Sequence, residues 1–412
     1  MSLSDLLPYL SIGDTGSRQR HPSAFQESFS LASRQQGMVR ESAKADCPSA
    51  ITRVQLTRSG RKRIIVKEVN WLGDLVMSLP ALRAVRSSLS TSSLSVLVRH
   101  DLAGFFDGIG WVDEVIPYSM RRGVAGLLDQ IRIIATLRAR RFDLAIIFPN
   151  SFRSALWMML AGVLRRAGYS TDGRGFLLTD RAMPNASAKN GHQRFYWLEM
   201  VHDTLGIWPA ADIEYKPLEV SPQRAARMRE FLDARRRTPQ APLIAISPIA
   251  AYGPAKEWSP QRFAELIDLL GKFAGAECVL LGTVSDRSKC QQVAAMSRKG
   301  AIVAAGETDV AELKALLSVC DGFAGNDSGA MHLAAAIGIP AVGVFGSTNP
   351  LRTGPVGVKA TVIYHPVECS PCLQRTCRFG HYRCLHSVAP AEVAETLAQL
   401  GAFKNARSAA LR

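Results

Sequence analysis

A carboxylate follows the first strand-like run of the chain, within a Gly-Asp turn. The β-rich run 64–69 leads directly into the sequence N-W-L-G-D, which ends at Asp74. Gly73 permits a tight turn, so Asp74 is expected at the N-terminus of the next helix. It can serve there as a helix cap. Alternatively, if partial burial keeps its pKa near the working pH, it can act as a general base toward an attacking hydroxyl.

A second polar group follows a later strand, where N-D-S-G-A-M-H occupies positions 326–332. A helix beginning near Ser328 points its free amides and the positive end of its dipole at an anion such as a diphosphate. Gly329 leaves room for close approach, and His332 adds a donor. Asp327 is itself anionic, so it suits the cap of the turn or a sugar hydroxyl better than a phosphate. A plain capping box is the alternative.

Two further loops carry cations after strands. The sequence Y-G-P-A-K-E-W places Lys256 in a Gly-Pro loop, where an ammonium group suits a leaving phosphate. The alternative is a solvated loop lysine. The sequence P-N-S-F-R-S places Asn150 and Arg153 after strand 143–148, where a guanidinium can pair with the carboxylate or phosphate of an acceptor. Segment 121–141 adds six Arg, which favours a solvated helix face but also suits docking to anionic lipid.

Half of the eight cysteines lie close together, at Cys369, Cys372, Cys377 and Cys384. In an intracellular chain such a density favours a zinc or iron–sulfur site over disulfides. The two close pairs of a zinc knuckle are absent, however, and a structural loop is the alternative. We predict no metal site and no required cofactor.

Strands and helices alternate in two arrays, from residue 64 to 148 and from residue 243 to 400, which predicts parallel sheets covered by helices. Ligands of such sheets bind outside the carboxyl ends of the strands, where all the motifs above fall. The predicted fold is α/β, with two Rossmann-like domains facing a central cleft. The predicted units are a disordered extension 1–62, an acceptor-side domain 63–238, a donor-binding domain 239–389 with the Cys-rich loop, and a C-terminal helix 390–412 that returns to the first domain.

Composition narrows the classes of protein. The 412 residues carry 50 Lys and Arg against 35 Asp and Glu, a net charge of +15, which favours polyanionic partners. No run approaches the ~20 apolar residues of a membrane span, and Ala155–Leu164 is interpreted as a buried helix. The extension lacks a secretory signal, so we expect cytoplasmic residence. ATPase, dehydrogenase, zinc protease and α/β-hydrolase motifs are absent, and no recognised nucleic-acid motif appears.

Taken together, the five motifs resemble glycosyltransferase family 9, the ADP-heptose:lipopolysaccharide heptosyltransferases, and within it the heptosyltransferase II branch. In chain order they begin at Val69, Pro149, Tyr252, Asn326 and Cys369. The resemblance runs from about residue 64 to the C-terminal helix. The chain departs from the family pattern in its long N-terminal extension and in the sequence S-P-I-A-A at 247–251.

The resemblance implies a GT-B fold and an inverting transfer of L-glycero-D-manno-heptose from ADP-heptose to the first inner-core heptose of Kdo–lipid A. It also implies contact with the anionic inner face of the inner membrane and no nucleic-acid partner. Carried over by position, Asp74 would be the catalytic base and Lys256 the partner of the diphosphate. The remaining implied donor-site residues are Asp327, Ser328, Gly329 and His332, and the acceptor-side residues are Asn150 and Arg153.

Two alternatives stay open from the residues. One is an enzyme of the same fold that uses another nucleotide-sugar or another acceptor. The other belongs to a different class, a metal-containing binding module built around the cysteines.

Overall fold

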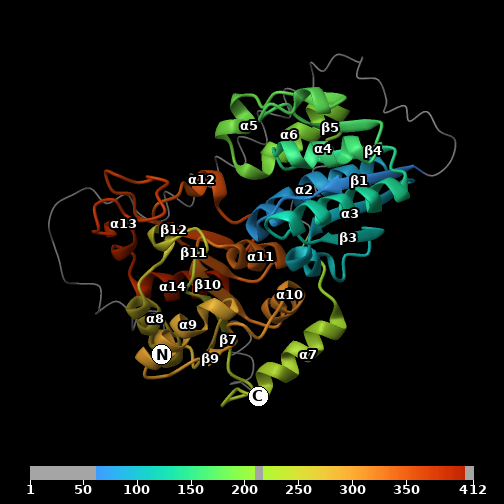
Figure 1. Ribbon diagram of the computed structural model, residues 1–412. Helices are drawn as coiled ribbons and strands as arrows, with labels where there is room; N and C mark the ends of the chain where they lie inside the picture. Colours follow the sequence, from blue (N-terminus) through green and yellow to red (C-terminus); the bar gives the residue numbers. More distant parts are fainter. Residues whose placement is uncertain (1–61, 209–216, 404–412) are drawn as a thin grey trace. The chain divides into compact units, whose positions relative to one another are not determined.

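The computed structural model describes residues 62–208 and 217–403 of the chain. Nearly all of the predicted extension 1–62 therefore lies outside the described residues. Two six-stranded sheets form the frame, with strand orders β3-β2-β1-β4-β5-β6 and β12-β11-β10-β7-β8-β9. Within each sheet the neighbouring strands run parallel (Figure 1). The described residues of both sheets belong to one compact unit. The α/β prediction with two Rossmann-like halves is confirmed.

The first half alternates strands with helices. Its central strands are continuous apolar runs because parallel strands are buried on both faces. Its elements are β1 Arg63–Lys67, α2 Leu72–Ser88, β2 Ser93–Arg99, η2 His100–Phe106, β3 Glu114–Tyr118, α3 Val124–Arg140, β4 Leu144–Ile147, α4 Phe152–Leu160, β5 Arg165–Tyr169, η3 Gly175–Leu177, β6 Asp180–Ala182, α5 Ala186–Asn190 and α6 Gln193–Leu205.

The second half repeats the pattern, as the alternation of strands and helices from residue 243 to 400 predicted. Its elements are α7 Pro222–Asp233, β7 Leu243–Ser247, η5 Pro254–Lys256, α8 Pro260–Phe273, β8 Glu277–Leu280, η6 Val284–Asp286, α9 Arg287–Met296, β9 Ile302–Val303, α10 Val310–Ser318, β10 Gly322–Asn326, α11 Gly329–Ile337, β11 Ala341–Phe345, α12 Pro350–Thr353, β12 Ala360–Tyr364, α13 Arg383–His386 and α14 Pro390–Leu400.

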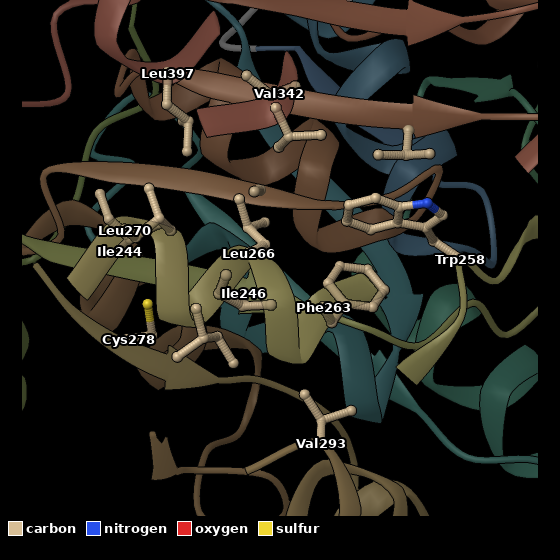
Figure 2. Packing of buried hydrophobic residues seen from close by; sticks show 14 of the residues in the cluster. Ile244, Ile246, Trp258, Phe263, Leu266, Leu270, Cys278, Val293, Val342 and Leu397 are labelled. Atoms are coloured by element: carbon tan, nitrogen blue, oxygen red, sulfur yellow. The ribbon is translucent and has the colours of Figure 1, made fainter. Parts of the chain in front are cut away.

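A hydrophobic core lies between the second sheet and its helices. Helix α8 turns Phe263, Leu266 and Leu270 inward at the spacing of one helix face, toward Ile244 and Ile246 of β7 (Figure 2). Helix α14 contributes Val393 and Leu397 to the same cluster, and it packs against α8, β10 and β11. The prediction that the C-terminal helix returns to the first domain is therefore wrong for α14, because its apolar face is buried against the second sheet.

The two halves also contact each other. The ammonium of Lys314 on α10 is buried and donates a 2.7 Å hydrogen bond to the carbonyl of Phe105 on η2. The ring of His192 lies 2.9 Å from the carbonyl oxygen of Gly354. Helix α7, expected in the first domain, packs against α10 of the second half. The predicted domain boundaries stay predictions.

The apolar run 155–164 does not form one buried helix. Helix α4 covers Phe152–Leu160, and the chain then turns so that Leu164, 68% exposed, precedes strand β5. Met159 and Leu160 on α4 are exposed as well, so an apolar run alone does not establish burial. Within residues 62–208 and 217–403, no helix combines the length and the apolar character needed to cross a membrane.

Candidate active site

Asp74 lies in the first turn of α2, at the carboxyl end of β1. The residue at the N-cap is Trp71, and Asp74 is the third residue of the helix, so the interpretation of Asp74 as the cap is wrong. Its side chain is half-buried. Burial raises the pKa of Asp74 to about 6, and the nearby ammonium of Lys256 opposes that rise. The carboxylate therefore has the ionisation behaviour of a general base near neutral pH.

Lys256, in the short helix η5, faces the same region from the second half of the chain. Its Nζ lies 2.5 Å from Oδ2 of Asp327 and 4.9 Å from the centre of the Tyr252 ring. With a side chain only 13% exposed, it is not the solvated loop lysine of the alternative. Thr348, just after β11, donates a 2.6 Å hydrogen bond to the same Asp327 oxygen. Asp327 thus holds Lys256 and does not cap α11, whose N-cap residue is Ser328.

The N-terminus of α11 presents polar atoms that the described residues leave unpaired. The side chain of Ser328 does not cap the helix, and its Oγ is buried without a hydrogen-bond partner among the described residues. The same holds for Nδ1 of His332 and Nδ2 of Asn326. Burial lowers the pKa of His332 to about 4, so its ring is neutral at pH 7. Unpaired buried polar atoms are costly, which fits a position built to meet a polar ligand.

Two glycines allow the motifs of the two halves to touch. A Cβ at Gly73 would lie 2.9 Å from Cδ2 of His332. A Cβ at Gly329 would lie 2.9 Å from Cβ of Leu72. Both distances are too short for carbon atoms, so α2 and α11 approach this closely because neither position has a side chain.

The Cys-rich loop supports the loop that carries Lys256. The hydroxyl of Tyr252 donates a 2.6 Å hydrogen bond to the carbonyl of Leu373, and the amide of Ala255 donates a 3.0 Å bond to the carbonyl of Arg375. The amide of Leu373 in turn donates to the carbonyl of Ser347, beside Thr348. This loop therefore has a direct structural part in the site.

The four cysteines of this loop are free thiols. Sulfur atoms of Cys369 and Cys377 lie 3.9 Å from the ring nitrogens of His381. In the described part of the chain, no group of three or more His, Cys, Asp or Glu side chains is arranged to hold a metal ion.

The predicted acceptor-side residues form a separate group at the start of α4. Asn150 donates a 2.7 Å hydrogen bond to the hydroxyl of Tyr196, while its Oδ1 is buried without a partner among the described residues. The guanidinium of Arg153 lies 5.8 Å from the ring centre of Trp157. Arg153 also acts electrostatically on Lys67, whose ammonium is buried at the end of β1.

Sequence reasoning missed a buried polar cluster beneath these residues. Burial lowers the pKa of Lys67 to about 7 and raises the pKa of Glu68 to about 7. The hydroxyl of Tyr118, at the end of β3, donates a 2.9 Å bond to Oδ1 of Asn70. The rule that ligands gather at the carboxyl ends of strands would have singled out these residues, as well as Thr348.

The structure thus brings together Asp74, Lys256, Asp327, Ser328, Gly329 and His332, and places Asn150 and Arg153 in a neighbouring group of the first half. A carboxylate that titrates near neutral pH is combined with a cation and the open N-terminus of a helix. Such an arrangement can accept a proton from a nucleophile and stabilise a leaving anion. The individual roles stay predictions.

Comparison with known proteins defines the class. The family model for glycosyltransferase family 9 (heptosyltransferase) matches residues 130–383, more than half of the chain. The chain therefore belongs to glycosyltransferase family 9, and the prediction of a glycosyltransferase is confirmed.

Particular relatives narrow the comparison further. The chain is 29% identical to lipopolysaccharide heptosyltransferase 2 of Salmonella typhimurium over 351 residues, which cover 82% of this chain and 98% of the relative. It is 28% identical to the Escherichia coli protein of the same name, with 81% and 97% covered. The solved structure of E. coli ADP-heptose LPS heptosyltransferase II matches with a TM-score of 0.69 and 26% identity, over 82% of this chain and 98% of that one. A family 9 structure from Veillonella parvula, 22% identical with a TM-score of 0.74, supports the fold.

Proposed function

We propose that this protein transfers L-glycero-D-manno-heptose, with inversion, from ADP-heptose to the first inner-core heptose of Kdo–lipid A. Heptose transfer in lipopolysaccharide core biosynthesis is supported by the family and by relatives named lipopolysaccharide heptosyltransferase 2. The observation that carries the chemistry is that Asp74, whose pKa burial raises to about 6, lies near enough to Lys256 of the other half of the chain for the ammonium to act on it electrostatically.

In the proposed reaction, Asp74 takes the proton of the acceptor hydroxyl. The acceptor oxygen forms a bond to the anomeric carbon while the bond from that carbon to the diphosphate breaks, and ADP leaves from the opposite face. Lys256 and the amides at Ser328 would stabilise the negative charge that grows on the diphosphate. In this proposal the positive charge comes from the protein, so no metal cofactor is required.

Asp327 would position Lys256 for this role. Its Oδ2 accepts the hydrogen bond of Thr348 and binds the ammonium of Lys256. Gly329 and His332 would line the donor side. Asn150 and Arg153 would face the acceptor, whose phosphates and Kdo carboxylates suit a guanidinium. Because the proposed acceptor is a lipid, the enzyme would act in the cytoplasm at the inner face of the inner membrane.

A donor and acceptor panel tests the proposal. Purified protein is incubated with ADP-heptose and several other nucleotide-sugars, and with Kdo–lipid A carrying zero, one or two heptoses. We expect transfer only from ADP-heptose and only onto the acceptor that carries one heptose. Transfer from another nucleotide-sugar would leave the mechanism in place but would refute the assigned donor. If no donor is used while the folded protein binds none of the nucleotides, the proposed function is wrong.

A further inference from the structure

Helix α3 carries an apolar stripe on the face that points away from the protein. Four large apolar residues of the stripe are between 49% and 79% exposed. We define the α3 stripe as Val124, Leu127, Leu128 and Ile131. Their spacing of three and four residues places them on one side of the helix.

The opposite side of α3 is the one buried against the sheet. Gly126, Asp129, Ile133 and Leu137 are its buried positions. Ile133 and Leu137 belong to the hydrophobic core of the first half. The helix is therefore apolar on two faces, although only one is needed for the fold. The six arginines of this segment favoured a solvated, charged helix face, but the exposed face of the helix is apolar along the stripe.

Arginines flank the stripe. Arg121 and Arg122 precede the helix and Arg132 follows the stripe, and all three side chains are exposed. Asp129 pairs with Arg121 at 2.6 Å and with Arg132 at 3.7 Å from the buried side of the helix. The three arginines outnumber the single carboxylate of Asp129, so the apolar stripe has positive charge around it. This is the composition of a helix that lies in the interface of an anionic bilayer.

The stripe lies one helix away from the predicted acceptor residues. Helix α4, which begins just after Asn150 and includes Arg153, packs beside α3 (Figure 1). Trp157 of α4 donates a 3.2 Å hydrogen bond to Gln130 of α3. Phe152 at the start of α4 is exposed and lies 5.9 Å, between ring centres, from exposed Phe176. The first half therefore carries a second exposed apolar pair, next to the residues that would bind the acceptor.

We propose that the α3 stripe is the surface by which the enzyme docks on an anionic lipid bilayer. The proposal rests on the proposed function, in which the acceptor is anchored in a membrane. Docking through α3 would keep the α4 end near the bilayer surface, where the sugar of a lipid-linked acceptor emerges. A second copy of the chain fits the stripe less well, because a symmetric contact would bring the flanking arginines of both copies together.

Vesicle flotation with the full-length protein tests the proposal. Vesicles of phosphatidylcholine with about 30% phosphatidylglycerol are compared with vesicles of phosphatidylcholine alone, in the absence of donor and acceptor. We expect the wild type to bind the anionic vesicles. The double variant Leu127→Gln/Ile131→Gln should lose at least about tenfold in partitioning. The variant Arg122→Gln/Arg132→Gln should lose about fivefold per arginine on anionic vesicles.

A control variant removes two exposed apolar side chains elsewhere. Val284 and Met296 are exposed apolar residues of the second half, so Val284→Gln/Met296→Gln should bind vesicles like the wild type. Wild-type protein that fails to float, or a stripe variant that floats as well as the wild type, refutes the docking surface. A stripe variant that turns a dimer into a monomer by light scattering, with flotation unchanged, assigns the stripe to a second copy and also refutes it.

Activity assays separate this proposal from the proposed function. On a delipidated heptose–Kdo oligosaccharide in solution, the stripe variant should transfer heptose at the wild-type rate. On acceptor embedded in anionic vesicles, its rate should fall together with its binding. If wild-type protein floats but transfers heptose to neither acceptor, the proposed function fails while the docking surface stands.

Discussion

Replacing Asp74 with Asn tests the proposed base most directly. The amide keeps the size of the side chain but cannot accept the proton of the acceptor hydroxyl. Loss of a general base costs typically 10²–10⁴-fold in rate, so we expect kcat to fall within that range. Binding of ADP-heptose should be retained, because the proposed donor contacts come from Lys256 and the N-terminus of α11.

The pKa of Asp74 predicts how strongly the activity depends on pH. With the pKa of Asp74 raised to about 6 by burial, about nine-tenths of the carboxyls are ionised at pH 7 and about one-tenth at pH 5. The wild-type kcat/KM should therefore fall about tenfold between these two pH values. An ordinary aspartate with a pKa near 3.8 would leave it almost unchanged. The Asp74→Asn variant should lack this acid limb in its residual activity.

Stability distinguishes loss of the base from loss of the fold. Because the folded-state pKa is raised, the folded protein binds more protons than the unfolded chain between pH 3.8 and about 6. Stability therefore falls as the pH rises through that window, and the cost of the buried charge is fully present above it. After screening by solvent, removing the charge should stabilise the variant at pH 8 by on the order of 1 kcal/mol. Near-native turnover of a folded Asp74→Asn variant would refute the reasoning.

Three further variants examine the contacts around the base. Lys256→Gln should weaken donor binding and kcat, and should move the acid limb to higher pH, because removing the cation raises the pKa of Asp74; an unmoved limb with unchanged KM and kcat contradicts both roles. Gly73→Ala should destabilise the protein by about 1–3 kcal/mol in denaturant unfolding, since the new Cβ would lie 2.9 Å from His332; an unchanged midpoint would show that the ring moves freely. Asp327→Asn leaves a buried ammonium without its carboxylate and should cost roughly 3 kcal/mol, whereas unchanged stability would mean that the pair contributes nothing to the fold.

Local sequence patterns predicted much of the fold, and the strands that they missed share a physical reason. Strand β7 is a continuous apolar run and α8 has a regular apolar face, so both follow from periodicity. Strand β5 begins with Arg165 and Arg166, and β6, at the edge of its sheet, has only three residues and includes Asp180 and Arg181, so neither has the apolar run of a central strand. Sheet position decides their conformation more than composition does.

The candidate site shows the same limit. The turn at Asp74 and the loop of Lys256 could each be placed at the carboxyl end of a strand from sequence alone. Their proximity could not, because 181 residues separate them and the contact depends on how α2 meets α11. The prediction that Asp327 caps the helix was wrong for a related reason. Its cation comes from a distant loop, whereas the nearby sequence offered only a helix end to cap.

Gly73 packs against the imidazole of His332, and Gly329 packs against Leu72. In each pair, the volumes of the two residues have to fit each other, although the residues lie in distant parts of the chain. A methyl group introduced at one member has to be offset by atoms removed at the other. Second-site suppressors of a substitution at position 73 should therefore arise at position 332, and those of a substitution at 329 should arise at 72.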